Sequence, residues 1–203
     1  MARPICAKCK TPLARCFCDL VVNVTPAVEV IIWQHPSEAG HAKGTVPLLA
    51  RCLTNSQLII AETLNRCDFE KRVGPTARQL QLLFPTDQLQ PAPAQDMGSN
   101  RLHVPTAGQL RLLVLDGTWR KARKLLYLNP WLSELRPYPL TAPGPGRYSI
   151  RKAEKPGQLS TLEAVCAAIS QAEKSASHSL PILQAFDQYL IRLSQQNPHA
   201  PTE

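Results

Sequence analysis

The sequence lacks any long apolar run. None of its segments approaches the roughly 20 apolar residues that a membrane-spanning helix requires. The first ten residues are polar, contain two cysteines and do not resemble a signal peptide, which has an apolar central region. We therefore expect a soluble, cytoplasmic protein that does not associate with membranes. The length of 203 residues suits one ordinary domain with a small appendage.

Acidic residues are scarce in one part of the chain. The whole sequence has 23 Lys and Arg against 15 Asp and Glu, a net charge of +8. Residues 101–155 contain 11 basic and only three acidic residues, so this stretch carries the entire surplus. A concentrated positive charge suits a polyanion, because each neutralised phosphate releases counterions. We favour a polyanionic partner over a solvated basic face that only aids solubility.

The seven cysteines are an odd number, which argues against a disulfide framework. Four of them lie within 13 residues near the N-terminus: Cys6, Cys9, Cys16 and Cys18. Four thiolates at this spacing are typical of a closed, structural zinc site, although iron accepts the same ligands. The alternative is a redox-active Cys-x-x-Cys pair, which usually requires a strand-to-helix setting that is not evident here. We interpret the other three, Cys52, Cys67 and Cys166, as small core residues.

Short apolar runs alternate with amphipathic segments along the rest of the chain. Predicted strands cover residues 28–33, 58–61, 80–84 and 112–115, with a further short strand at 148–150. Predicted helices cover residues 47–55, a segment from Trp119 that Pro130 ends, one that Ser160 and Glu163 cap, and one that Pro181 opens. Residues 86–108 are interpreted as a long loop. The alternation predicts an α/β domain with a mostly parallel sheet.

The turn after the strand at 112–115 carries the clearest chemical motif, Asp116-Gly117-Thr118-Trp119. Ligands bind open α/β sheets at the carboxyl ends of the strands, where Asp116 is expected. Gly117 permits a tight turn and Thr118 can cap the next helix, whose N-terminus favours an anionic group. Trp119 offers its ring to a purine or a sulfonium. For an isolated motif of this kind, Asp116 as a helix cap and Trp119 as a core residue are the simpler interpretation.

Several segments together resemble the DTW-domain family of tRNA-uridine aminocarboxypropyltransferases. They are residues 115–123, 129–132, 147–152 and 159–164, and the four-cysteine head and residues 83–85 also match. The resemblance thus covers nearly the whole chain. It implies a catalytic domain over residues 25–203, related to the SPOUT class and with a C-terminal trefoil knot that holds S-adenosylmethionine. A zinc-binding head would occupy residues 1–24.

The resemblance also implies an activity and a set of site residues. The family transfers the 3-amino-3-carboxypropyl group of S-adenosylmethionine, a co-substrate, to N3 of a tRNA uridine, and methylthioadenosine is released. Asp116 would lie beside the uridine. The loops around S-adenosylmethionine would contribute Phe84, Pro85, Leu115, Gly117, Thr118, Trp119, Tyr148, Ile150, Ser160 and Thr161. The basic residues expected to bind tRNA are Arg120, Lys121, Arg123, Lys124, Arg147, Arg151 and Lys152. As an alternative, the last three of these would bind the carboxylate of S-adenosylmethionine.

S-adenosylmethionine has three carbons bonded to its positively charged sulfur. The orientation of the co-substrate relative to the uridine would decide which of them is transferred. Asp116 would accept the N3 proton as a general base, or only orient the uridine. Two alternatives stay open: an RNA methyltransferase on the same scaffold, which would release S-adenosylhomocysteine, and a non-catalytic zinc-containing RNA-binding protein. His35 and Glu38 are expected near the edge of the pocket, although we favour a structural or solvated role for the histidine. The oligomeric state is open, with a monomer as the starting expectation.

Overall fold

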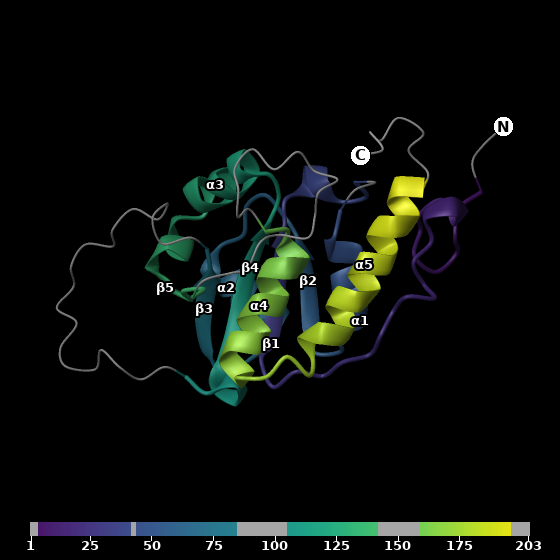
Figure 1. The fold of residues 1–203 in the computed structure, drawn as a ribbon. Coiled ribbons are helices and arrows are strands. Elements are labelled where there is room, and N and C mark those ends of the chain that lie inside the picture. The colour runs from purple at the N-terminus through teal and green to yellow at the C-terminus, as the bar shows by residue number, and fades with distance from the viewer. Residues whose placement is uncertain (1–3, 42–43, 85–104, 142–158, 196–203) are drawn as a thin grey trace.

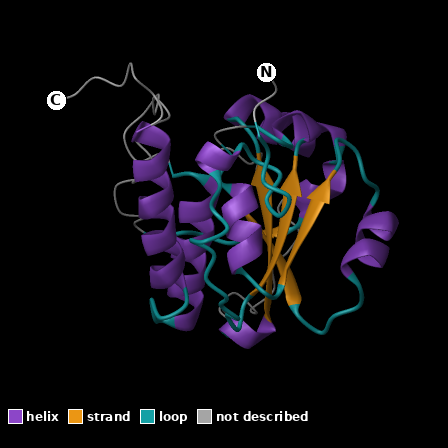
Figure 2. Ribbon diagram, turned by 90° about the vertical axis from the view of Figure 1, so that its right-hand side faces the viewer, coloured by secondary structure: helices purple, strands orange, loops and turns teal. Residues whose placement is uncertain are grey.

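The protein is a parallel sheet between two layers of helices (Figures 1 and 2). A computed structural model describes residues 4–41, 44–84, 105–141 and 159–195. Five parallel strands have the order β2-β1-β4-β3-β5 and span β1 (Glu29–Gln34), β2 (Ser56–Ile60), β3 (Gln79–Leu83), β4 (Leu110–Asp116) and β5 (Arg136–Pro137). The helices are α1 (Val46–Cys52), α2 (Arg66–Val73), α3 (Trp119–Leu128), α4 (Thr161–Glu173) and α5 (Ser179–Gln195). The predicted α/β class is confirmed.

Each face of the sheet is covered by its own hydrophobic core. Successive side chains of a strand point to opposite faces. In β1, Val30 and Ile32 therefore join a core with α1, α4 and α5, whereas Ile31 and Trp33 join a second core with α2 and α3. Burial on both faces explains why the central strands read as continuous apolar runs instead of alternating ones.

The predicted elements agree with the structure in most places. The first four predicted strands are present, with ends shifted by one or two residues, and Ser160 and Glu163 form the expected capping box of α4. Neither α2 nor the two-residue β5 was predicted, because α2 buries only Phe69 and Val73 and presents little apolar periodicity. The strand expected at 148–150 and most of the loop expected at 86–108 lie outside the described residues.

The interpretation of the three remaining cysteines is partly wrong. Cys52 and Cys166 are fully buried, as expected, but Cys67 is exposed. It lies in the first turn of α2, two residues before Phe69, and this spacing turns it away from the face that Phe69 and Val73 bury.

The predicted knot and domain division stay predictions. Residues 142–158, which connect β5 to α4, lie outside the described part. Among the described helices, none combines the length and the apolar character needed to cross a membrane.

A buried ion pair joins the beginnings of the two central strands. Glu29 of β1 lies opposite Arg111 of β4, and the guanidinium donates to both carboxylate oxygens at 2.9 and 2.8 Å. The Arg111 side chain is only 6% exposed, and it also donates to the backbone carbonyls of Val73 and Gly74. Arg111 therefore does not contribute to a cationic surface, although it lies in the basic stretch of the sequence.

Removing one partner of this ion pair should destabilise the fold. We expect Arg111→Ala to lower the free energy of unfolding by about 3 kcal/mol, because it leaves the largely buried Glu29 carboxylate with only the longer contact from Arg78, at 3.7 Å, as its counter-charge. The double variant Glu29→Leu/Arg111→Met should recover a large part of that loss. Urea denaturation of both variants measures the difference, and equal stability of the single variant and the unaltered protein would contradict the structural role of the pair.

Candidate active site and cysteine cluster

Asp116 ends β4 with its carboxylate held by donors from two other elements. Gln34, its register partner at the end of β1, donates from Nε2 to Oδ2 at 2.8 Å, and the Thr161 hydroxyl at the start of α4 donates to Oδ1 at 2.6 Å. The backbone N–H of His35 donates to the Asp116 carbonyl at 3.0 Å. The carboxylate is therefore fixed in one orientation and is partly accessible.

The position of Asp116 in the sheet is one where ligands bind. From β1 the chain continues to β2 on one side, and from β4 it continues to β5 on the other side. Open α/β sheets bind ligands at the carboxyl ends of strands where the connections diverge in this way. Gln34 and Asp116 are the last residues of the two strands on either side of this point.

The turn into α3 is built by Gly117 and Thr118. The Thr118 hydroxyl accepts from the Lys121 backbone N–H, so Thr118 is the N-cap and the interpretation of Asp116 as the cap is wrong. A Cβ added at Gly117 would lie 3.0 Å from the Lys121 Cβ and 3.7 Å from the His35 Cβ. Glycine therefore avoids a close contact with Lys121 in the first turn of α3, whereas 3.7 Å to His35 would be an ordinary van der Waals contact.

Other residues expected around S-adenosylmethionine meet at the same end of the sheet. Phe84, which follows β3, contacts the ring of Trp119 edge-on, with the centroids 5.9 Å apart. Leu115 is buried one residue before Asp116, and Ser160 and Thr161 approach from the start of α4. Trp119 is only partly buried. The expected residues that lie outside the described part are Pro85, Arg147, Tyr148, Ile150, Arg151 and Lys152.

Two carboxylates at this edge bind the lysines of α3. The Lys121 ammonium donates to Glu38, which is buried, at 2.6 Å, and the Lys124 ammonium donates to Glu62 at 2.5 Å. The bond from Lys124, and after it the one from His35, lower the pKa of Glu62. Lys121 and Lys124 therefore connect α3 to the segments that follow β1 and β2.

His35 is buried and bonded at both ring nitrogens. Ser37 donates to its Nδ1 from both the backbone N–H and the hydroxyl, and its Nε2 lies 3.2 Å from Glu62. With Nδ1 accepting, Nε2 carries the proton and donates to the carboxylate. His35 is thus structural and not solvated. Sequence analysis did not single out Gln34 or Glu62 as site residues, and their only signal is a position at or just after a strand end.

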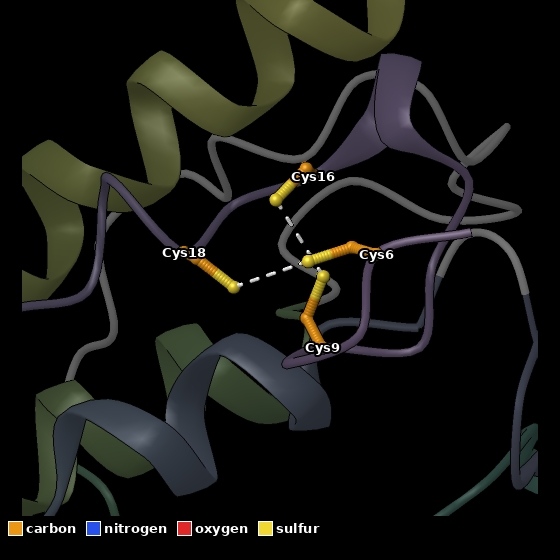
Figure 3. A group of neighbouring side chains, drawn as sticks. All are labelled: Cys6, Cys9, Cys16 and Cys18. Carbon is orange, nitrogen blue, oxygen red and sulfur yellow. Dashed lines mark hydrogen bonds between the residues drawn. The ribbon is translucent and has the colours of Figure 1, made fainter. Parts of the chain in front are cut away.

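The four N-terminal cysteines point their sulfur atoms toward one another (Figure 3). All four Sγ atoms lie within 4.8 Å of each other, with Cys6–Cys18 at 3.8 Å and Cys9–Cys16 at 3.7 Å. A tetrahedral zinc site with bonds of about 2.3 Å has sulfur–sulfur separations of about 3.8 Å. The donor set therefore fits a tetrahedral metal ion and leaves no position open for a substrate.

The surroundings of the thiols make their proton affinities unequal. Desolvation opposes ionisation of Cys9, but the Thr11 hydroxyl and amide bring its pKa down to about 6. Desolvation and the neighbouring sulfur atoms raise the pKa of Cys18 to about 12. Four thiolates at this separation repel each other, and a divalent ion would compensate their charge.

The cysteine head packs against α5 on the side of the sheet that faces away from α3 (Figure 1). The rings of Phe17 and Tyr189 meet edge-on at 5.5 Å. Arg192 donates to both carboxylate oxygens of Asp19, which holds the Asp19 pKa at about 2, and also to the Cys16 carbonyl. The head is therefore part of the same core as α1, α4 and α5.

Comparisons with known proteins agree on one family. A family model described as the DTW domain matches residues 3–194. tRNA-uridine aminocarboxypropyltransferase 2 of Drosophila melanogaster is 29% identical over 185 residues, which are 86% of this chain and 70% of that protein. tRNA-uridine aminocarboxypropyltransferase A of Arabidopsis thaliana is 32% identical over 133 residues, 61% of this chain and 50% of that protein. The Mus musculus tRNA-uridine aminocarboxypropyltransferase 2 is 29% identical over 181 residues, 85% of this chain and 58% of that protein.

This chain therefore spans 50–70% of the length of these curated relatives. No solved structure matches it significantly.

Loss of one cysteine ligand should release the metal and loosen the head. We expect the purified protein to contain a single zinc ion, and Cys9→Ser to lose it and to unfold at a lower temperature, because metal binding is coupled to folding. Elemental analysis and thermal unfolding measure both effects. Cys67→Ser, at an exposed position outside the cluster, is the matched control and should keep the metal. If Cys9→Ser retained its full metal content, the cluster would not be the binding site.

Proposed function

The chain belongs to the DTW domain family, and from this premise we propose that it transfers the 3-amino-3-carboxypropyl group of S-adenosylmethionine to N3 of a uridine in tRNA. The bond from N3 to the terminal carbon of that group forms, and the bond from this carbon to sulfur breaks. Methylthioadenosine leaves with the sulfur, and the N3 proton passes to a base. The observation that carries the proposal is the Asp116 carboxylate, oriented by Gln34 and Thr161 at the divergence of the central strands.

Asp116 is the proposed base. Within the described residues, its two oxygens each accept one bond, whereas a carboxylate offers about four acceptor positions. Capacity therefore remains for the N3 proton of a uridine that approaches the accessible side. Since Gln34 and Thr161 fix both oxygens, the base needs little reorganisation when the uridine binds.

The donor site is proposed to lie against the residues around Asp116. S-adenosylmethionine supplies a carbon made electrophilic by the adjacent sulfonium. The partly exposed Trp119 ring, backed by Phe84, suits the adenine or the sulfonium. The N-terminus of α3, a helix of ten residues, favours a carboxylate at the Gly117–Thr118 turn. Pro85, Tyr148, Ile150 and Ser160 are proposed as further contacts on the strength of family membership.

Zinc is proposed to be structural. The four sulfur donors would hold it. An ordered head would then keep Phe17 and Asp19 in contact with Tyr189 and Arg192 of α5. A site closed by four thiolates supplies folding energy and takes no part in the transfer.

The direct test is to incubate the full chain with unmodified tRNA and S-adenosylmethionine. We expect nucleoside mass spectrometry to detect 3-(3-amino-3-carboxypropyl)uridine, with methylthioadenosine as the by-product in equal amount. S-adenosylhomocysteine and a methylated base would instead identify a methyltransferase. Absence of S-adenosylmethionine binding in a calorimetric titration would identify a non-catalytic RNA-binding protein.

Replacing the proposed base should reduce turnover more than binding. We expect Asp116→Asn to lower kcat by about 10²–10⁴, the usual contribution of a general base, while the Kd for S-adenosylmethionine changes little. Thr161→Val keeps the carboxylate but removes one of its donors, so it should cost less. Asp68→Asn, an exposed carboxylate on α2, is the matched control. Near-normal turnover of Asp116→Asn would eliminate the general-base role.

A further inference from the structure

The cationic residues of α3 divide into two sets with different surroundings. Lys121 and Lys124 are bound by Glu38 and Glu62, as described above. Arg120 and Arg123 are exposed, and within residues 4–41, 44–84, 105–141 and 159–195 neither has a carboxylate partner. Of the four cations at the start of α3, the two arginines are therefore the ones whose charge is available to a partner.

An exposed aromatic ring continues the same face of the helix. Tyr127 is 83% exposed, the largest value among the exposed large hydrophobic residues of the described part. Arg120, Arg123 and Tyr127 are spaced by three and four residues, and this spacing aligns side chains on one face of a helix. The opposite face buries Ala122 and Leu125 in the core. Single exposed aromatic residues are ordinary on surfaces, but this one follows two available arginines.

The face formed by Arg120, Arg123 and Tyr127 leads away from Asp116 along the helix axis. α3 begins three residues after Asp116, at the carboxyl end of the sheet (Figure 1). With a rise of about 1.5 Å per residue, Tyr127 lies about 10 Å along the helix axis from Arg120. A polynucleotide with one base at Asp116 would therefore reach Arg120 first, then Arg123, and then the tyrosine ring.

We propose that this face, Arg120–Arg123–Tyr127, binds an unpaired segment of the RNA substrate that flanks the modified nucleotide, with the ring of Tyr127 stacked on one of its bases. This inference rests on the proposed function, since it takes tRNA as the partner. Arginines neutralise phosphates, and an aromatic ring accepts any base on its face, so the combination grips single strands without reading their sequence. An RNA duplex keeps its bases stacked internally and would gain only the phosphate contacts.

The test compares variants of the full chain in binding to fluorescein-labelled unmodified tRNA, measured by anisotropy at several salt concentrations. We expect Tyr127→Ala to raise the Kd by about 10- to 100-fold, the equivalent of one lost base stack, without changing the salt dependence. Tyr127→Phe keeps the ring and should bind almost normally. Arg120→Ala/Arg123→Ala should flatten the slope of log K against log salt by roughly 1.5, as two lost phosphate contacts require.

Two controls make the result specific. Arg66→Ala/Arg72→Ala removes the same charge from α2 and should leave the slope nearly unchanged. A fully paired RNA of the same length should bind Tyr127→Ala as well as the unaltered protein. The proposal is overturned if Tyr127→Ala binds tRNA normally, or if it loses tRNA and duplex equally.

These outcomes are separate from the test of the activity. A chain that modifies tRNA while Tyr127→Ala changes neither Kd nor KM would retain the proposed function and refute this surface. A chain that forms no modified uridine while Tyr127→Ala still weakens only RNA with unpaired bases would retain the surface and refute the function.

Discussion

The pairing of β1 with β4 is the constraint on which the candidate site depends. Its register sets Glu29 opposite Arg111 at one end and Gln34 opposite Asp116 at the other. The first pair is a buried ion pair, and the second orients the carboxylate that we assign to catalysis. A shift of one residue would turn each side chain to the other face, separating both pairs and exposing core residues. The register that forms the two cores thus also positions the Asp116 carboxylate.

The start of α3 is attached to the rest of the sheet edge through charge. Gly117 leaves room for the Lys121 side chain in the first turn, and Lys121 and Lys124 bind carboxylates in the segments after β1 and β2. Four cations within five residues would repel one another without these acids. Binding the lysines leaves the arginines exposed, so one short helix supplies both an anchor to the sheet and a cationic surface.

The cysteine head is connected to the opposite core, away from α3. Phe17 packs on Tyr189, and Arg192 binds Asp19 beside the cluster. A head so short has little apolar surface of its own, and its order depends on those contacts and on the metal that its thiolates are proposed to bind. The head belongs to the core on the other face of the sheet from α3, and its four sulfur ligands leave no open position on the metal. Both features favour a structural role for the metal site.

Local pattern in the sequence was enough to predict the α/β class, the central strands, the caps of α3 and α4 and the four-cysteine cluster, because each depends on periodicity or on spacing over a few residues. Asp116 was singled out by its motif, but the family resemblance was needed to assign it to a site. Gln34 and Glu62 were not singled out, since their partners lie 82 and 62 residues away and only the parallel pairing brings them together. The same reason explains why the sequence predicted RNA binding for the lysines and the arginines of α3 alike. The lysines are bound and the arginines exposed because Glu38 and Glu62, from the segments after β1 and β2, lie beside the lysines.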